Sequence, residues 1–402
     1  MEPRKKNFRP LDGSFFCIRR SRREMKQFSV PSGMRDLILG ECETKKDLQL
    51  KIENILSKWG YEEVITPTIE YYSTYENGFI DIKEEDMYKF FDANGKILML
   101  RADMTIPIAR VAATKFKDET KPLRFRYCAN VFKVHESLSG LKDEITDCGV
   151  ELIGMEEKCA ELEILVTAME VLQVVEDKKV ILEIGDVNFF RKACQSLQLS
   201  EEETMKLSKL LDSKSLIALE DYLKQLQLNE KDQQFFNYLP WLSGDASILE
   251  EAKKYAFNDD LVAIIDRLQL LDAQLKELGY ETIEYDLGKA SNLNYYTGLI
   301  FEAYVEGVGT RILSGGSYNT LIERFGEKMS ATGFSIKLDS LLEVVPLKKK
   351  KKGYILEYPS HQAVEAMKIA AKLRKEKKVE MYVNDNIDEI RYKEDSLCCQ
   401  SH

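Results

Sequence analysis

The order of the strand-rich and helix-rich segments constrains the fold of this chain more than any other feature. Three runs rich in strand-forming residues, "KILMLRADMT", "LRFRYCANVFKVH" and "ITDCGVELIGM", follow one another with only turns between them. After a helix-rich stretch the pattern resumes with "TIEYDLG", "GLIFEAYVEG", "TRILSGGSY" and "ATGFSIKLD". Runs of strands without regular alternation with helices predict an α+β fold with an antiparallel sheet, rather than a doubly wound parallel sheet.

Helical segments flank and divide these strands. Residues 43–59 predict an amphipathic helix that ends at Gly60, and the segment after it predicts an edge strand bent at Pro67. Residues 160–175 are apolar on most sides, which is typical of a buried helix. Residues 187–275 are rich in Leu, Lys and Glu and poor in β-branched residues, so we expect a helical insertion within the sheet-forming part of the chain.

Shifts in composition divide the chain into four parts. Residues 1–24 contain clustered arginines but no apolar segment typical of a secretory signal, and we expect them to form a disordered N-terminal extension. Residues 25–345 hold the sheet and its helical insertion. The lysine run within residues 346–352 predicts a solvated linker. Residues 353–402 have room only for a small α/β module built as strand, helix and strand.

The charge and the cysteine pattern argue against several classes of protein. A net charge of -10 argues against a nucleic-acid partner, because phosphate binding normally requires a basic surface. The sequence contains no run of about 18 apolar residues that could span a membrane. The eight cysteines form no CxxC pair and the three histidines lie far apart, so we expect no metal site, no disulfide framework and a cytoplasmic location.

Two charged segments carry side chains that could form a site. In "LRADMT", Asp103 and Thr105 follow a predicted strand, where they could bind a ligand or only hydrogen-bond the local backbone. The second segment is a charged hairpin with Gly140 at its tip and Glu151 on the returning strand, and such loops can be merely solvated. Taken alone, both segments are compatible with a site and with ordinary structure.

Two further segments are rich in tyrosine and glycine. Tyr295 and Tyr296 stand in "YYTG", where an aromatic pair could cover a ligand or pack across neighbouring strands. Gly315 and Gly316 precede Tyr318, and paired glycines either form a turn or let a ligand approach the backbone. Sharp backbone bends beside aromatic hydroxyls suit a pocket for a small polar ligand.

The order of these segments resembles one known family. The motifs "SGMRDLILGE", "LRADMT", "CGVELIG", "YYTGLIFEAY", "LSGGSYNTLIERFG" and "TGFSIKLDSL" together resemble the class II catalytic fold of histidyl-tRNA synthetase over residues 28–345. The resemblance implies a class II aminoacyl-tRNA synthetase-like antiparallel sheet flanked by helices, which agrees with the α+β class inferred above. It also implies a pocket for histidine.

The resemblance assigns the histidine contacts residue by residue. The positions that it implies are Asp103, Thr105, Asp147, Glu151, Tyr295, Tyr296 and Tyr318. Asp147 stands where the synthetase has glutamine, whereas the other side chains still suit the contact. Carboxylates can accept hydrogen bonds from an ammonium or an imidazole N–H, and charge-assisted bonds of this kind are worth about 1.5–3 kcal/mol.

The nucleotide half of the site departs from the synthetase pattern. Lys133 and His135 replace an arginine and a glutamate of the hairpin, and Ser291 and Ser340 replace two further arginines. Lysine lacks the planar fork of arginine, and serine supplies no charge. Because the loss of one preorganised electrostatic donor typically lowers a rate by about 10² to 10³, we expect a catalytically silent site without a cofactor.

A synthetase-like core without nucleotide chemistry resembles the family of regulatory subunits of ATP phosphoribosyltransferase. That resemblance implies a partner, the short-form catalytic subunit of the phosphoribosyltransferase, and a role in the first step of histidine biosynthesis with histidine as feedback effector. It implies a homodimer within a hetero-oligomer, and we expect no tRNA partner. Two alternatives stay open: a histidine–tRNA ligase with degenerate motifs, and a histidine sensor with another partner.

Overall fold

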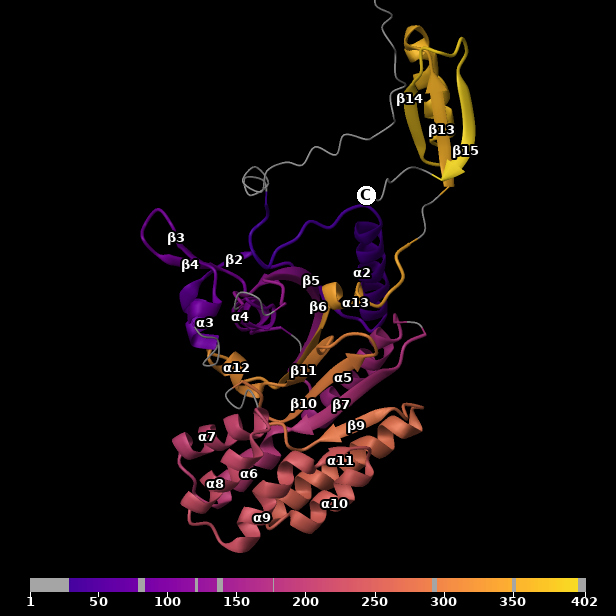
Figure 1. Cartoon of the computed structure of the whole chain (residues 1–402). Coiled ribbons are helices and arrows are strands. Elements are labelled where there is room, and N and C mark those ends of the chain that lie inside the picture. Colours follow the sequence, from indigo (N-terminus) through magenta and orange to yellow (C-terminus); the bar gives the residue numbers. More distant parts are fainter. Residues whose placement is uncertain are drawn as a thin grey trace, which may run out of the picture.

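The computed structural model describes most of the chain, namely residues 29–78, 84–119, 122–135, 140–175, 177–290, 295–348 and 352–396. The N-terminal extension predicted for residues 1–24 lies outside this part, and so does Ser291. The described residues form a large sheet, a group of helices along one side of it, a projecting hairpin and a small C-terminal module (Figure 1).

A nine-stranded, mostly antiparallel sheet forms the centre of the described chain. Its strands follow the order β1-β5-β6-β12-β11-β10-β7-β9-β8, in which β1·β5 and β7·β9 are parallel and the other pairs antiparallel. The strands are β1 Glu62–Glu63, β5 Leu123–Phe132, β6 Glu144–Ile153, β7 Val180–Asp186, β8 Ser243–Gly244, β9 Ile283–Asp286, β10 Leu299–Val305, β11 Leu313–Ser317 and β12 Ala331–Lys337. The predicted α+β class with an antiparallel sheet is confirmed.

Side-chain alternation gives the sheet one apolar face and one face that carries a cavity. On β6, the side chains of Cys148, Val150 and Leu152 are buried in the main core. Asp147 and Glu151, on the opposite face of the same strand, line the cavity. The apolar face packs against α2 Gly40–Lys58 and α5 Glu157–Leu172. These are the amphipathic and the buried helix that the sequence predicts.

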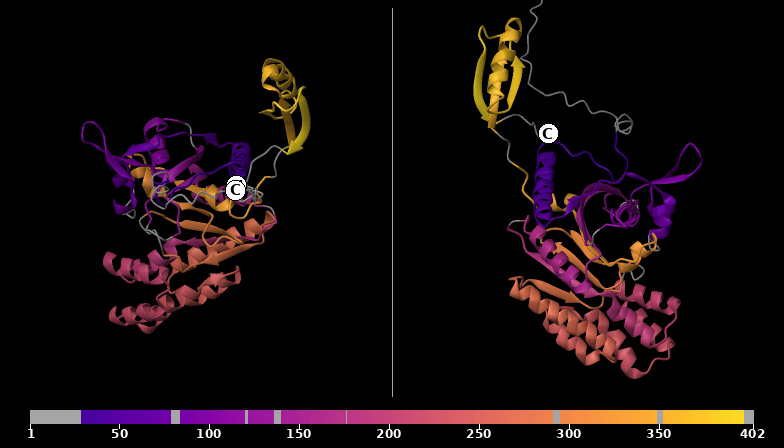
Figure 2. Two further views of the ribbon diagram at one scale, coloured as in Figure 1. Left: turned by 45° about the horizontal axis from the view of Figure 1, so that its top comes forward. Right: turned by 180° about the vertical axis from the view of Figure 1, so that it is seen from behind.

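Helices α6–α11 lie together along the side of the sheet that ends in β9 and β8 (Figures 1 and 2). Their bounds are α6 Val187–Ser196, α7 Glu201–Asp212, α8 Leu216–Gln225, α9 Glu230–Tyr238, α10 Ser247–Tyr255 and α11 Asp259–Glu277, with the short η3 Leu239–Trp241 after α9. Their buried side chains, including Phe189, Phe235 and Phe236, belong to the same apolar core as the sheet. The insertion therefore packs as part of the core.

A second, three-stranded sheet projects from the core as a hairpin with one added strand. Its order is β2-β4-β3, with β2 Ile69–Tyr71, β3 Lys89–Phe91 and β4 Ile97–Leu100. Helix α3 Tyr72–Gly78 packs against this sheet, α4 Thr105–Lys115 packs against α3, and α12 Asn319–Glu323 packs against α4. The short η2 Glu84–Asp86 precedes β3. Pro67 falls in the gap between β1 and β2, which divides the predicted bent strand in two.

The C-terminal residues form a small module with its own core. Its sheet has the order β14-β13-β15, with bounds β13 Lys352–Tyr358, η4 Ser360–Gln362, α14 Ala363–Leu373, β14 Val379–Val383 and β15 Arg391–Ser396. The strand, helix and parallel strand agree with the prediction, whereas β15 was not predicted because its sequence "RYKEDS" contains almost no apolar residue.

Among the described residues, no helix is both long enough and apolar enough to cross a bilayer.

Candidate functional site

A cavity of about 590 Å³ opens on the polar face of the sheet. Its lining comes from β6, β11 and β12, from the segment that leads into α4, and from the two tyrosines before β10. It contains every residue assigned above to histidine, namely Asp103, Thr105, Asp147, Glu151, Tyr295, Tyr296 and Tyr318. The fold therefore brings together segments that lie far apart in the sequence.

Glu151 is the most buried acid of the cavity, with only 1% of its surface exposed. The Thr105 hydroxyl donates to its Oε1 at 2.8 Å, and the Tyr318 hydroxyl donates to its Oε2. Burial raises the pKa of Glu151 to about 8, although these hydroxyl donors act in the opposite direction. A cationic group placed beside Glu151 would favour its ionised form.

Asp103 and Asp147 each present a buried carboxylate oxygen that has no hydrogen-bond partner among the described residues. For Asp103 the free atom is Oδ2, because Oδ1 accepts from the backbone N–H of Ile106 at the start of α4, at 2.8 Å. For Asp147 the free atom is Oδ1. Burial raises the pKa of each to about 6, and nearby Lys133 acts against this rise. Buried acceptors without partners are rare, and these two are placed to accept from a ligand.

Three tyrosine rings form one wall of the cavity. The rings of Tyr295 and Tyr318 are stacked with centroids 5.7 Å apart, and Tyr296 meets Tyr295 edge to face at 4.7 Å. Gly315 and Gly316 lie inside strand β11 and form no turn. A β-carbon at position 316 would lie 2.4 Å from the backbone oxygen of Leu299 and 2.7 Å from Cδ1 of Tyr296, so the glycine makes room for the neighbouring strand β10 and for this ring.

The nucleotide-side positions lie in the same cavity where the structure describes them. Lys133, His135 and Ser340 line it, whereas Ser291 lies outside the described residues. His135 is held by a carboxylate, because its Nδ1 lies 3.3 Å from Oδ1 of Asp143. Of these three residues, only Lys133 brings an ammonium group to the lining of the cavity.

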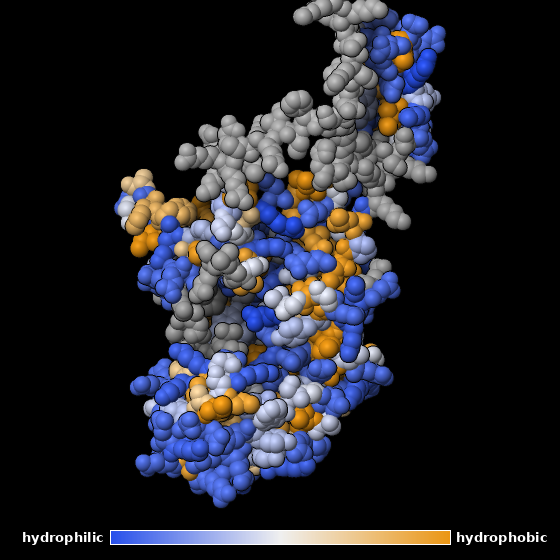
Figure 3. Space-filling model, in the orientation of Figure 1, coloured by the Kyte–Doolittle hydropathy of each residue, from blue (hydrophilic) through white to orange (hydrophobic). Residues whose placement is uncertain are grey.

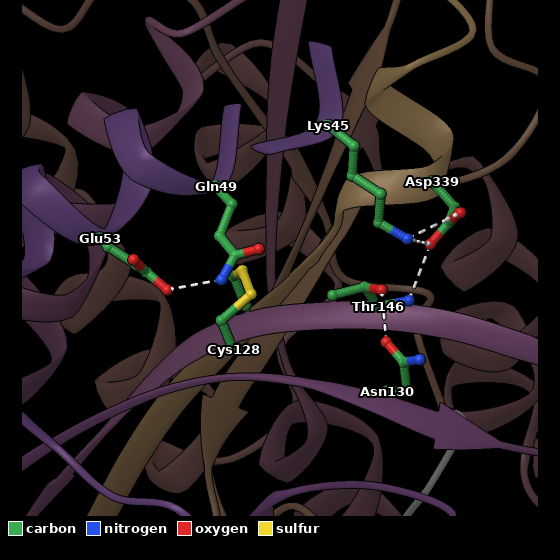
Figure 4. The surroundings of a disulfide bond; sticks show 8 residues. Lys45, Gln49, Glu53, Cys128, Asn130, Thr146 and Asp339 are labelled. Carbon is green, nitrogen blue, oxygen red and sulfur yellow. Dashed lines mark hydrogen bonds and ion pairs between the residues drawn. A yellow bond between two sulfur atoms is a disulfide. The ribbon is translucent and has the colours of Figure 1, made fainter. Parts of the chain in front are cut away.

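Asp339, the residue before Ser340, has a structural role. It lies in α13 Leu338–Leu341, where it pairs with Nζ of Lys45 on α2 at 3.1 Å. It also accepts from the backbone N–H of Thr146 on β6 at 2.8 Å (Figure 4). The carboxylate thus connects α2, α13 and β6 at the lining of the cavity.

A disulfide bond near this contact corrects one expectation. Cys128 on β5 and Cys148 on β6 are directly paired across the two strands, with Cα atoms 4.0 Å apart, and form the bond (Figure 4). We expected no disulfide framework because the eight cysteines form no CxxC pair, and the two that are bonded lie 20 positions apart. Only the register of β5 against β6 reveals the pair.

Two cations of the cavity were missed by sequence reasoning. Lys337 ends β12, and Arg311 precedes β11. Alternation along β12 provides a signal for Lys337, because Gly333, Ser335 and Lys337 all line the cavity. No comparable pattern marks Arg311, which lies in the connection between β10 and β11.

Comparisons with known proteins agree with this architecture. The family model described as histidyl-tRNA synthetase matches residues 33–341. A relative from Clostridium novyi (strain NT), named ATP phosphoribosyltransferase regulatory subunit, is 36% identical over 379 residues, which cover 92% of this chain and 90% of the relative. A relative from Bacillus mycoides (strain KBAB4) with the same name is 35% identical over 356 residues, which cover 87% of this chain and 84% of the relative.

Solved structures give the same result. A protein from Bacillus halodurans C, described as an ATP phosphoribosyltransferase regulatory subunit/histidyl-tRNA synthetase, superposes with a TM-score of 0.80 at 29% identity, covering 90% of this chain and 94% of that one. Histidyl-tRNA synthetase from Nostoc sp. PCC 7120 has a TM-score of 0.72 at 20% identity over 88% and 85% of the two chains, which shows the shared fold alone. This chain belongs to the family of ATP phosphoribosyltransferase regulatory subunits, with the class II fold of histidyl-tRNA synthetase.

Proposed function

We propose that this chain is a non-catalytic, cytoplasmic regulatory subunit of ATP phosphoribosyltransferase that binds histidine in its cavity. One observation carries the proposal: Asp103 and Asp147 present buried oxygens without partners in the cavity that also holds Glu151. The α-ammonium and imidazole N–H groups of histidine are the donors that such an acidic set lacks. The names of the relatives support a catalytic subunit of ATP phosphoribosyltransferase as the partner, and the family resemblance implies the short form of that subunit.

Histidine would act by shifting an equilibrium between two states of the assembly. A ligand changes such an equilibrium only if it binds one state more tightly than the other. The coupling between two sites is typically about 1–3 kcal/mol, which corresponds to a five- to 150-fold change in affinity.

The assembly would contain the chain as a homodimer. The hairpin of β3 and β4 projects from the core, and Figure 3 shows apolar residues on it. Its strands and the adjoining β2 expose Tyr71, Phe91 and Ile97 by 48%, 71% and 41%. Exposed apolar side chains grouped on one projecting element are typical of a protein interface.

A second candidate function is that of an active histidine–tRNA ligase. The observation that favours it is the presence of Lys337 and Arg311 in the cavity, since cations from new positions could take over charge stabilisation from the missing arginines. Against it stands Ser340, which supplies neither charge nor reach where the synthetase has arginine.

One set of assays on the purified chain separates these functions. We expect the chain to activate a short-form phosphoribosyltransferase and to make that activity sensitive to histidine, while it catalyses no histidine-dependent exchange of pyrophosphate into ATP. Clear exchange by the chain alone would identify a ligase. Histidine binding without any effect on the phosphoribosyltransferase would identify a sensor with another partner.

A further inference from the structure

The first helix of the insertion, α6, lies against the segment that carries two tyrosines of the cavity. Four side chains of this helix are buried in the main core, namely Phe189, Phe190, Ala193 and Cys194. Because residues three positions apart are neighbours on the surface of a helix, Asn188 and Arg191 can act on the same adjoining segment. Helix α6 is thus a fixed support for these two polar side chains.

Both side chains donate hydrogen bonds to the backbone beside the tyrosine pair. Nη2 of Arg191 donates to the carbonyl oxygen of Tyr296 at 2.8 Å. Nδ2 of Asn188 donates to the carbonyl oxygen of Thr297, also at 2.8 Å. Nη1 of Arg191 donates to Oδ1 of Asn188 at 2.8 Å, so each of the two side chains orients the other. Two consecutive carbonyl groups are therefore held from α6.

The same segment is connected to the third tyrosine of the cavity. The backbone N–H of Thr297 donates to the carbonyl oxygen of Ser317 at 2.7 Å, and the Thr297 hydroxyl accepts from the backbone N–H of Asn319 at 2.9 Å. Tyr318 lies between these two residues, and its hydroxyl donates to Glu151. A displacement of Thr297 would therefore reach both tyrosine segments.

A buried ion cluster holds α6 in place independently of these contacts. Asp186 caps the helix, because its side chain accepts from the first turn at 2.7 Å. Arg267 of α11 pairs with Asp186 and with Glu161 of α5, and the Ser317 hydroxyl donates to the same glutamate at 3.0 Å. We therefore expect α6 to keep its position when only the side chains that contact the tyrosine segment are changed.

We propose that Arg191 and Asn188 are positioning residues of the cavity, which hold the backbone next to the tyrosine pair and so set the place of the tyrosine rings. The consequence for histidine rests on the proposed function, which assigns these rings to that ligand. A binding group must be held to within about 0.5 Å to make its full contact. The insertion thus shapes the cavity, although none of the described residues from 187 to 275 lines it.

Two measurements on the full chain test this proposal, namely hydrogen exchange of the amides of residues 295–298 without ligand and calorimetric titration with histidine. Arg191→Met removes the guanidinium donors, and Asn188→Asp removes the amide donor but keeps an oxygen for Arg191. We expect exchange in this segment to become about tenfold faster in each variant, because local hydrogen bonds limit its opening. Histidine affinity should fall about tenfold, because the rings are no longer held in place.

Two further variants separate positioning from a general loss of stability. In Arg191→Lys an ammonium group can still donate to a carbonyl oxygen, so this variant should recover part of the affinity that Arg191→Met loses. Arg124→Met is the matched control, because Arg124 donates to both oxygens of Glu163, at 2.9 and 2.8 Å, outside the cavity. It should lower the free energy of unfolding but leave the exchange of residues 295–298 and the histidine affinity unchanged.

Three results would overturn the proposal. They are unchanged exchange of residues 295–298 in both Arg191→Met and Asn188→Asp, equally faster exchange in Arg124→Met, and faster exchange with unchanged histidine affinity. If the unchanged chain binds no histidine, the proposed function is wrong, and the exchange measurement alone decides the positioning role. If Arg191→Met does not fold, as judged by circular dichroism, Asn188→Asp decides.

Discussion

Gly333 on β12 lies directly opposite Glu151 on β6, and a β-carbon at position 333 would overlap Oε2 of that carboxylate. The missing side chain on one strand thus creates the space that the acid on the next strand occupies. Thr105 and Tyr318 donate to the same carboxylate from two other segments. The position of Glu151 is therefore set by the lack of a side chain at Gly333, by these two hydrogen bonds and by a longer one from the Tyr127 hydroxyl at 3.5 Å.

The first prediction concerns this glycine. Gly333→Ala should displace Glu151 and weaken histidine binding at least tenfold, as measured by calorimetry. Overpacking of a close-packed site typically costs about 1–3 kcal/mol, so the free energy of unfolding should fall by a similar amount. The control is Gly40→Ala, because a β-carbon there would meet only the backbone oxygen of Lys348 at 3.9 Å. Equal histidine affinity in both variants would contradict the role given to Gly333.

The second prediction concerns the charge of Glu151. Glu151→Gln keeps the size of the side chain but removes its ability to ionise, so a charge-assisted bond worth about 1.5–3 kcal/mol to histidine is lost. We expect histidine affinity to fall more than tenfold in calorimetric titrations. Glu251→Gln, on α10 outside the cavity, is the matched control and should bind histidine normally. An unchanged affinity of Glu151→Gln would place the ligand elsewhere.

The third prediction concerns pH and the stability of the chain without ligand. Folding raises the pKa of Glu151 from 4.5 to about 8, so between these values the folded chain holds a proton that the unfolded chain has released. The stability contributed by this group is therefore fully present below pH 4.5 and decreases as pH rises towards 8. The limiting slope is about 1.4 kcal/mol per pH unit.

Urea unfolding at pH 6 and pH 8 measures this contribution by difference. The unchanged chain should lose more stability over this interval than Glu151→Gln, by about 1–3 kcal/mol, because the variant has no proton to release there. Buried acids that do not interact with Glu151 contribute equally to both proteins and cancel, whereas the charge of Asp103 acts on Glu151 and is part of the measured difference. Parallel pH dependences would show that Glu151 titrates near its ordinary pKa.

The sequence was sufficient to predict the α+β class and the grouping of the site residues. Alternating apolar residues identify β5, β6 and β12, and the family resemblance assigns Asp103, Glu151 and Tyr318 to one pocket, where the structure also brings them together. The first signal is local in each strand, and the second rests on the order of the motifs along the chain. They do not require knowledge of which strand lies beside which.

Features that depend on strand register could not be predicted. The pairing of Cys128 with Cys148 follows from the alignment of β5 with β6, and the sequence spacing of 20 gives no indication of it. The proximity of Lys337 to Arg311 could not be predicted either, because it requires β11 and β12 to be neighbours in the sheet. The role of the glycine pair in β11 could not be predicted for a different reason. Two adjacent glycines occur both in turns and in strands that make room for an aromatic ring, and the sequence does not distinguish the two.

The last prediction concerns the projecting hairpin. Phe91→Asp places a charge on its most exposed aromatic side chain, which is 71% exposed in the single chain. If this surface is covered by a second copy, burial of the unpaired carboxylate is unfavourable, and the chain should become monomeric at micromolar concentration in sedimentation velocity experiments. Ile217→Asp is the control, because Ile217 is 81% exposed on α8 in the helical insertion. We expect that variant to stay dimeric, and monomers in both variants, or in the unchanged chain, would argue against a hairpin-mediated dimer.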